Sequence, residues 1–346
     1  MTHPLPTLLL ASAVLSGLSA RPGPAPEEAA PDSITIKLAT VAPEGSTWMK
    51  VLEKMKKEVY LRTRGRVNFR FYPGGIAGEE KTVLEKIRYG QLQAAGLTGI
   101  GMGEILPSSR IMELPFYFEN YEEYDYVVER LLPEFQRGFE ENGFVLLGWA
   151  EAGFANLYSR KPVRSMDALR ATKVWLRSGD PVIERVLHEL QIQPVPVALS
   201  DVLTSLQTGL LETVYVSPLA LLALQWHPHV SYAFHTPIFN IQAGLVVDVE
   251  TFAKLSEADQ ETVRRICSEH IGDLVGETRR ENAEAVEVLR EKGVQFLEPT
   301  AEHVREAEEM RGRIAAALTG PFFDEALLKR FEELLAEARR GGGEGQ

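Results

Sequence analysis

The side chains most able to do chemistry are not spaced for catalysis in this sequence. It has no GxSxG segment, which presents a serine nucleophile on a sharp turn, and no HExxH pair of zinc-binding histidines. The glycine-rich segment GIGMGE (99–104) lacks the GxGxxG spacing of a dinucleotide loop and carries no Walker lysine. We therefore predict no catalytic residue and no bound nucleotide. The sequence alone does not exclude a catalytic triad of Ser, His and Asp residues that lie far apart in the chain.

Metal ligands show no binding pattern either. His227 and His229 stand two residues apart in WHPH with no third ligand nearby, which is more typical of a polar loop than of a metal site. Cys267 is the single cysteine, which excludes an intrachain disulfide and a thiolate metal centre. Its neighbours, RRICSEH, favour a helix, so we expect a small buried core residue. We predict no metal and no cofactor.

The charge balance bears on the class of partner. The formal net charge of −12 argues against nucleic acid, because binding to phosphates needs a basic surface. Hydrophobic residues make up 45% and charged residues 25% of the chain, as in globular proteins. With 346 residues, the chain is long enough for one large domain or two ordinary ones.

The N-terminus predicts export. Residues 5–20, LPTLLLASAVLSGLSA, form an apolar run of signal-peptide length that ends in small residues and is too short to span a bilayer. The following segment, RPGPAPEEAAPDS, has the composition of a disordered leader. No cysteine follows the run, which excludes a lipoprotein anchor, so we expect a periplasmic protein.

The elements that follow alternate between strands and helices. Residues 34–42 form a β-rich strand pattern, and Ser46 can cap a helix over 47–65. A strand over 66–75, a helix over 79–92 and a short apolar strand over 94–101 complete a β-α-β-α-β series. This order predicts a mostly parallel sheet with helices on its faces.

A second α/β unit begins after an apolar strand at 145–153. Short strands at 194–197 and 213–218 alternate with helical segments, and a long charged helix follows a cap at Ser256. We predict an α/β fold with two lobes and mixed sheets. The predicted boundaries are a signal peptide and disordered leader (1–32), lobe 1 (33–150 plus 238–275), lobe 2 with C-terminal helices (151–237 plus 276–325), and a terminal helix with a flexible tail (326–346).

The loops after the strands predict a binding site. In open α/β sheets, ligands bind at the carboxyl ends of strands. Those ends carry APEGSTW, GGIAGEE, LTGIG, EAGFAN, WLRSGDP and YVSP, which mix small, aromatic and a few charged residues. Such a mixture suits a mostly apolar pocket with a few oriented polar groups.

Several segments together resemble one family. YPGGIAGEE, ALSDVLTSLQTGLLETV, LPFYFENYEEYDYV and KPVRSMDALRATKVW are similar to the extracytoplasmic solute-binding subunits of tripartite ATP-independent periplasmic (TRAP) transporters, over about residues 34–313. The resemblance implies a periplasmic binding protein-like fold with two α/β lobes, hinge strands and a long bracing helix. It also implies hinge closure over a small-molecule ligand and membrane permease subunits as partners.

This sequence differs from the family that it resembles at three ligand-binding positions. Many members that bind carboxylates have a K-I-R stretch whose arginine pairs with the ligand carboxylate, and Trp175 occupies that position here. Ala155 stands where many members carry a second arginine. Val216-Ser217 replaces a Glu-Asn pair. An Arg-to-Trp exchange removes five donors and supplies a large apolar face.

These departures predict an unusual ligand. We expect a hydrophobic or amphipathic molecule, or a monocarboxylate for which Arg177, on the same side of its strand as Trp175, replaces the missing arginine. Glu79 follows a glycine loop at a helix start, where backbone amides could also hold an anion. The predicted ligand-binding residues are Arg177, Trp175, Phe154, Asn156, Tyr215, Ser217, Glu79 and Trp48.

Other functions stay open at this stage. A sensing or docking module that works with a periplasmic helical-repeat (TPR) partner would use the same fold, and so would a cryptic exported α/β enzyme or an ABC-type binding protein. An enzyme needs a nucleophile and base or a metal in the cleft, and the sequence places neither.

Overall fold

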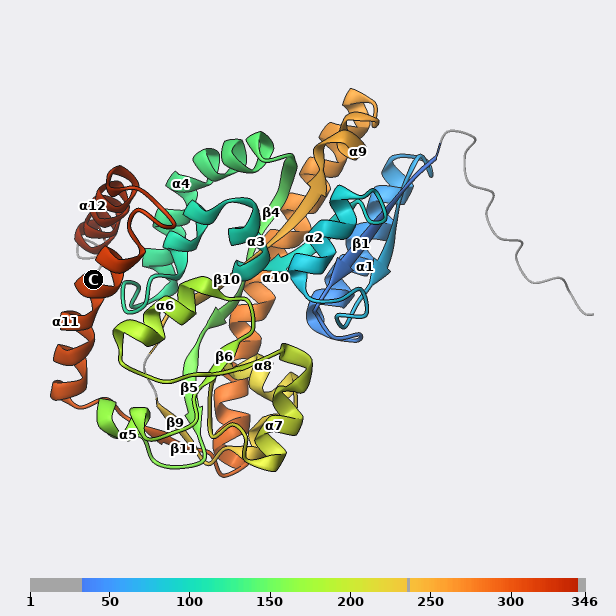
Figure 1. The fold of residues 1–346 in the computed structure, drawn as a ribbon. Helices are drawn as coiled ribbons and strands as arrows, with labels where there is room; N and C mark the ends of the chain where they lie inside the picture. Colours follow the sequence, from blue (N-terminus) through green and yellow to red (C-terminus); the bar gives the residue numbers. More distant parts are fainter. Residues whose placement is uncertain (1–32, 235–236, 342–346) are drawn as a thin grey trace, which may run out of the picture.

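The computed structural model describes residues 33–234 and 237–341. The predicted signal peptide and leader, and the predicted tail from residue 342 onward, lie outside these ranges. Figure 1 shows two groups of strands and helices joined by long strands and by one long helix. Within the described residues, no helix is long and apolar enough to cross a membrane.

The first group is built on a five-stranded sheet with the order β2-β1-β3-β10-β4. Its strands are β1 (Ile34–Thr40), β2 (Val67–Tyr72), β3 (Ala94–Thr98), β4 (Phe144–Phe154) and β10 (Asn240–Asp248). The β1–β2 and β1–β3 pairs are parallel, as the β-α-β-α-β order predicted, whereas β10 runs antiparallel to both β3 and β4. Helices α1 (Thr47–Arg62) and α2 (Glu80–Arg88) connect the parallel strands.

The predicted strand over 94–101 is too long. It ends at Thr98, and Gly99–Ile105 form helix α3. The carboxylate of Glu80 on α2 accepts hydrogen bonds from the backbone N–H groups of Thr98 (3.0 Å) and Gly101 (2.7 Å), and so satisfies donors at the start of α3. This cap comes from another helix, so the local sequence does not reveal it.

The second group contains a four-stranded sheet with the order β11-β9-β5-β8 and a two-stranded parallel sheet of β6 and β7. The strands are β5 (Asn156–Ser159), β6 (Trp175–Arg177), β7 (Val195–Val197), β8 (Thr213–Val216), β9 (Tyr232–Phe234) and β11 (Gln295–Leu297). The accompanying helices are α5 (Met166–Arg170), α6 (Pro181–Glu189), α7 (Val202–Thr208), α8 (Pro218–Ala223), and the short 3-10 turns η2 (Leu199–Asp201) and η3 (His227–His229). The mixed sheets agree with the predicted α/β class.

Two of the places where the chain crosses between the two groups lie side by side. Strand β4 leads directly into β5, and residues before β10 run beside this junction. The backbone N–H of Ala155 donates to the Phe239 carbonyl, and the N–H of Ile238 donates to the Ala155 carbonyl, each at 2.9 Å. These paired segments are the hinge strands between the lobes.

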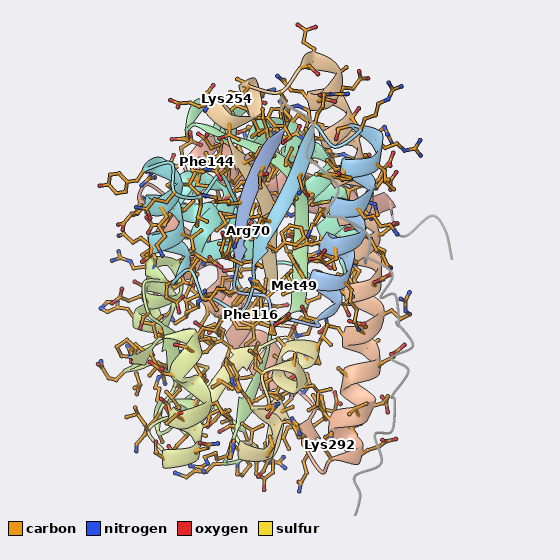
Figure 2. All side chains as sticks on the ribbon, turned by 90° about the vertical axis from the view of Figure 1, so that its right-hand side faces the viewer. Met49, Arg70, Phe116, Phe144, Lys254 and Lys292 are labelled. Atoms are coloured by element: carbon orange, nitrogen blue, oxygen red, sulfur yellow. The ribbon has the colours of Figure 1, made fainter. Side chains whose placement is uncertain are left out.

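The long helix α10 (Glu257–Glu291) braces both groups. Its 35 residues correspond to about 52 Å of helix. It packs against α1 and β4 on one lobe and against α8 on the other. In Figure 2, Lys254 and Lys292, which flank this helix, lie at opposite ends of the molecule. Ser256 caps the helix by accepting from the Asp259 N–H at 3.2 Å, as predicted.

The C-terminal helices contact both lobes. Helix α11 (Ala301–Leu318) packs on α6, whereas α12 (Glu325–Gly341) packs on α4 (Tyr121–Glu141), beside the first sheet. Arg339 on α12 pairs with Glu123 on α4 at 2.9 Å. The remaining elements are the 3-10 turn η1 (Pro107–Glu113) and α9 (Val249–Ala253). The predicted domain boundaries stay a prediction.

The core lies on both faces of the first sheet and under the second. Met49, Val51 and Met55 on α1 are buried against the sheet and α10. Ser46 begins α1 by accepting from the Met49 N–H at 3.4 Å, as predicted. Cys267 on α10 is fully buried in the same cluster, which confirms its predicted core position.

Candidate functional site

A cavity of about 370 Å³ lies between the two lobes. Its walls come from the loops that follow strands β1, β3, β6 and β8, where parallel and mixed α/β sheets bind ligands. The first lobe contributes Thr40–Pro43, Ser46–Trp48 and Thr98–Ile100. The second lobe contributes Trp175, Arg177, Asp180 and Tyr215–Ser217. The volume suits a small organic molecule.

Aromatic side chains form one wall of this cavity. The Trp175 ring stacks on Tyr215, with centroids 5.0 Å apart and planes 25° apart, and meets Trp226 edge-on at 5.3 Å. Its Nε1–H donates to the Val197 carbonyl at 2.9 Å. Stacking and this hydrogen bond therefore hold Trp175 in place as a rigid apolar part of the cavity wall.

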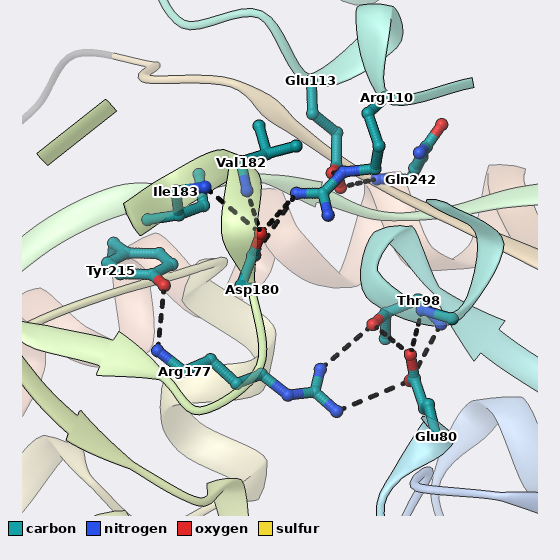
Figure 3. Close-up of polar contacts among 11 residues, drawn as sticks. Glu80, Thr98, Arg110, Glu113, Arg177, Asp180, Val182, Ile183, Tyr215 and Gln242 are labelled. Carbon is teal, nitrogen blue, oxygen red and sulfur yellow. Dashed lines mark hydrogen bonds and ion pairs between the residues drawn. The ribbon is translucent and has the colours of Figure 1, made fainter. Parts of the chain in front are cut away.

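Arg177 is paired across the cleft with the first lobe. Its Nη1 donates to Thr98 Oγ1 at 3.0 Å, and its Nη2 donates to Glu79 Oε2 at 3.2 Å. Glu80 Oε1 lies 3.5 Å from the same nitrogen. Figure 3 shows the guanidinium group reaching toward Thr98 and Glu80. Burial lowers the pKa of Arg177, but the charges of Glu80 and Glu79 outweigh it and the net pKa is raised.

A second arginine pairs across the same cleft. Arg110, on η1 of the first lobe, donates to Asp180 Oδ1 of the second lobe at 3.1 Å, and its Nε lies 2.6 Å from Glu113 Oε2. Asp180 also caps α6 by accepting from the N–H groups of Val182 (3.1 Å) and Ile183 (3.2 Å). Figure 3 shows Asp180 between Arg110 and the start of α6.

Glu113 is fully enclosed in this cluster. Burial raises the pKa of its carboxyl to about 7, against the opposing charge of Arg110, and the nearby charge of Asp180 adds to the rise. One of its oxygens accepts from the Gln242 N–H at 3.0 Å. This carboxyl therefore loses its charge more readily than an exposed one.

The glycines of GIGMGE make room for these carboxylates. A Cβ atom at Gly99 would overlap the Glu113 carboxylate, and one at Gly101 would lie 2.9 Å from Glu80 Oε2. The absence of side chains at Gly99 and Gly101 thus lets two acidic side chains approach the backbone closely. The sequence singled out these glycines as a weak nucleotide signal, and their structural role explains them without a nucleotide.

The charges around the cavity are mostly compensated by the protein itself. Four carboxylates, those of Glu79, Glu80, Glu113 and Asp180, surround the two guanidinium groups of Arg110 and Arg177. Arg110 is 3% exposed and Arg177 is 8% exposed. Among the cavity-lining residues that the structure describes, the remaining cation is Lys50, whose side chain is exposed.

Most of the predicted ligand-binding residues come together here. Trp48, Trp175, Arg177, Tyr215 and Ser217 line the cavity. Glu79 is the N-cap residue of α2, although its side chain makes no hydrogen bond to that helix. It does not line the cavity itself, but it accepts a hydrogen bond from the lining residue Arg177.

Phe154 and Asn156 are not among the residues that line this cavity, so their role in ligand binding stays a prediction. Gly153 adopts a φ of 94°, which breaks the alternation of strand β4. The Phe154 ring then packs on Tyr121 of α4, with centroids 4.9 Å apart. Asn156 is buried in β5, 7% exposed.

Sequence reasoning missed four polar residues of the site. Glu80, Arg110, Glu113 and Asp180 all belong to the ion-pair clusters. The Asp-Pro pair in SGDP is a recognisable helix start and could have drawn attention to Asp180. Arg110 and Glu113 lie on an irregular 3-10 turn, where no local signal marks them.

His227 and His229 lie on η3 and are not among the residues that line the interlobe cavity. Within residues 33–234 and 237–341, no group of three or more His, Cys, Asp or Glu side chains is arranged to hold a metal ion.

Comparisons with known proteins place this chain in a family. Residues 38–318 match DctP, the bacterial extracellular solute-binding protein family 7. A solute-binding protein from Chromohalobacter salexigens is 26% identical over 245 residues, which cover 70% of this chain and 71% of that protein.

Solved structures share the fold. A TRAP periplasmic solute binding protein from Desulfovibrio salexigens with bound orotic acid has a TM-score of 0.79 at 16% identity and covers 88% of this chain and 99% of its own. Another from Pseudomonas putida F1, with bound D-glucuronate, has a TM-score of 0.77 at 22% identity and covers 86% and 97%.

The two lobes, the hinge strands and the cavity between them define a periplasmic binding protein-like solute-binding protein. The chain belongs to the bacterial extracellular solute-binding protein family 7, the family of TRAP solute-binding subunits. This is an extracytoplasmic family that binds small ligands for TRAP permeases, and it is not a family of enzymes.

Proposed function

We propose that this protein binds a predominantly apolar ligand without a free carboxylate between its lobes, and delivers it to the membrane subunits of a TRAP transporter. The observation that carries the proposal is the pairing of both cavity arginines with carboxylates of the protein itself. A carboxylate ligand would have to displace Glu79 from Arg177, or Asp180 from Arg110, and leave a carboxylate without its partner.

The walls support the same ligand class. Trp175 and Tyr215 offer flat apolar faces, and Trp48 faces the cavity from the other lobe. Ser217 keeps a polar group at the cavity, and its hydroxyl makes no hydrogen bond within the described residues. A hydroxyl, carbonyl or amine on the ligand could bond there, which would orient an otherwise apolar molecule.

Several of the structural neighbours were solved with an acid bound. Their bound ligands include orotic acid and D-glucuronate. The present chain differs where the resembling family pairs a ligand carboxylate with arginine, since Trp175 stands at that position. We therefore expect its ligand to differ in charge from theirs.

The test is to identify what the purified protein carries. Native mass spectrometry of the protein, followed by organic extraction, is expected to recover an uncharged or amphipathic molecule. Recovery of carboxylates alone, whether monocarboxylates or dicarboxylates, would overturn the proposal.

A monocarboxylate is the second candidate, because Arg177 lines the cavity and its partner Glu79 is partly exposed. In that case Arg177→Ala weakens binding of the anion by roughly 2 kcal/mol or more. An unchanged dissociation constant would show that Arg177 is not its anchor. Docking to a periplasmic helical-repeat partner rests on the resemblance alone and stays a prediction.

A further inference from the structure

A second cavity of about 330 Å³ lies in the second lobe, under helix α11. Side chains of α6, α11 and α5 form much of its wall, and Tyr215 and Phe239 belong to both this cavity and the interlobe one. The two hollows thus lie on opposite sides of a shared aromatic partition.

The partition is held in place. Tyr215 and Phe239 have ring centroids 6.0 Å apart, and Tyr215 is also stacked on Trp175. The Tyr215 hydroxyl accepts from the Arg177 backbone N–H at 3.3 Å. The ring is thus fixed from two sides and at its tip, and apart from Tyr215 and Phe239 the described linings of the two cavities have no residue in common.

The wall of the second cavity is apolar. Buried aliphatic side chains line it from several elements, and they include Leu169, Val174, Ile183, Leu187 and Met310. The charged lining residues are Glu119, Glu306, Glu308 and Arg311, and three of these lie on the single helix α11. Arg311 turns its guanidinium group over the Tyr117 ring, 5.2 Å from the centroid.

The size and chemistry of this space select a ligand class. An engineered apolar cavity of about 150 Å³ stays dry and binds benzene. The present cavity has about twice that volume, so it can hold a bicyclic aromatic or a comparable hydrocarbon group. Arg311 is the one cation among the described lining residues, and three acidic lining residues outnumber it, so the wall does not favour a carboxylate.

From these observations we infer that the protein has a second ligand site, under α11, for an uncharged apolar molecule of about bicyclic aromatic size. This site is separate from the interlobe cavity and does not depend on the proposed function. Apolar solutes would bind there by burial of hydrocarbon surface alone.

Two matched substitutions test the inference. Ala307 on α11 lines the second cavity and Ala220 on α8 lines the interlobe cavity, and both are half-buried. Ala307→Phe and Ala220→Phe each place a benzyl group in one cavity only. The probe is the neutral fluorophore N-phenyl-1-naphthylamine, titrated into the wild-type protein and both variants.

We expect the wild type to bind the probe at low micromolar concentration. In Ala307→Phe the affinity of the second cavity for the probe should fall at least tenfold. In Ala220→Phe the affinity of the second cavity should stay as in the wild type. If Ala307→Phe binds the probe like the wild type, or if Ala220→Phe alone removes all binding, the second site does not exist. Loss of the site in Ala307→Phe with no effect of Ala220→Phe would support the second site and count against the apolar interlobe ligand.

A second measurement locates the probe directly. Crystals soaked with 5-bromoindole should show a bromine anomalous peak among Leu169, Leu187 and Met310. The wild type and Ala307→Phe should also unfold at similar temperatures without probe, which separates a filled cavity from a damaged fold. A bromine peak in the interlobe cavity alone would overturn the inference.

Discussion

Nη2 of Arg177 lies 3.2 Å from Oε2 of Glu79, and the two residues belong to opposite lobes. The same guanidinium group lies 3.5 Å from Glu80, whose side chain is almost fully buried. The predicted ligand anchor is therefore also a bridge between the lobes. Its charge is paired within the protein, so an anionic ligand at this position would have to compete with Glu79 and Glu80.

Glu79→Gln should make the cavity more receptive to anions. The change removes one of the two carboxylates beside Arg177, while the neutral side chain keeps its size. Because the Glu79 side chain is 40% exposed, solvent screens its charge, and we expect benzoate to bind only about two- to fivefold more tightly. Isothermal titration calorimetry measures this, with the exposed residue Glu85 changed to Gln on the same helix as a control. Equal benzoate affinity in the wild type and Glu79→Gln would show that Glu79 does not restrain Arg177.

Asp180→Asn should destabilise the protein without removing the cap of α6, because asparagine also caps helices. The lost ion pair to Arg110 is buried, and removal of one partner of such a pair costs about 3 kcal/mol. Asp167→Asn breaks an exposed pair with Arg170 and should cost less than about 1 kcal/mol. Urea unfolding of both variants gives the comparison. A similar small loss in both would show that the cross-lobe pair contributes little.

Glu113 should make stability depend on pH. Its pKa rises from the ordinary value of 4.5 to about 7 on folding, so between these values the folded state binds more protons than the unfolded state. The free energy of unfolding from this group is highest below pH 4.5 and falls as the pH rises through 7, by at most about 1.4 kcal/mol per pH unit.

Glu113→Gln should flatten this fall, because the amide does not titrate. Arg110, Asp180 and Gln242 face the carboxyl and remain in place. Urea unfolding at pH 5 and pH 7.5 compares the variant with the wild type and with exposed Glu122→Gln. Parallel pH profiles for all three proteins would contradict the assignment to Glu113.

Gly99→Ala should destabilise through crowding. The added methyl group overlaps the buried Glu113 carboxylate, and overpacking of this kind costs about 1–3 kcal/mol. Gly272 on α10 has nothing within 4 Å of its Cβ position, so Gly272→Ala should stabilise by up to about 1 kcal/mol. Thermal unfolding of the two variants should therefore shift in opposite directions, and a shift in the same direction would refute the packing argument.

The local sequence pattern was enough to predict several helices and strands. Apolar spacing and the Ser46 and Ser256 caps predicted helices α1 and α10, and the strand–helix alternation predicted the parallel part of the first sheet. These features depend on neighbours a few residues apart, which is the range over which helical and strand periodicity carries information. The resemblance of several segments to the TRAP family added the hinge strands, the long bracing helix and the permease partners.

The tertiary structure alone decided how the charges are matched. Arg177 and Glu79 are 98 residues apart in the chain, and Arg110 and Asp180 are 70 apart, so no local pattern links them. Folding of the hinge strands brings the loops of both lobes to one cavity, and burial there makes each arginine take carboxylate partners. The sequence by itself determined that Trp175 stands where an arginine was expected, whereas the structure decided that the arginines of this cleft are already paired.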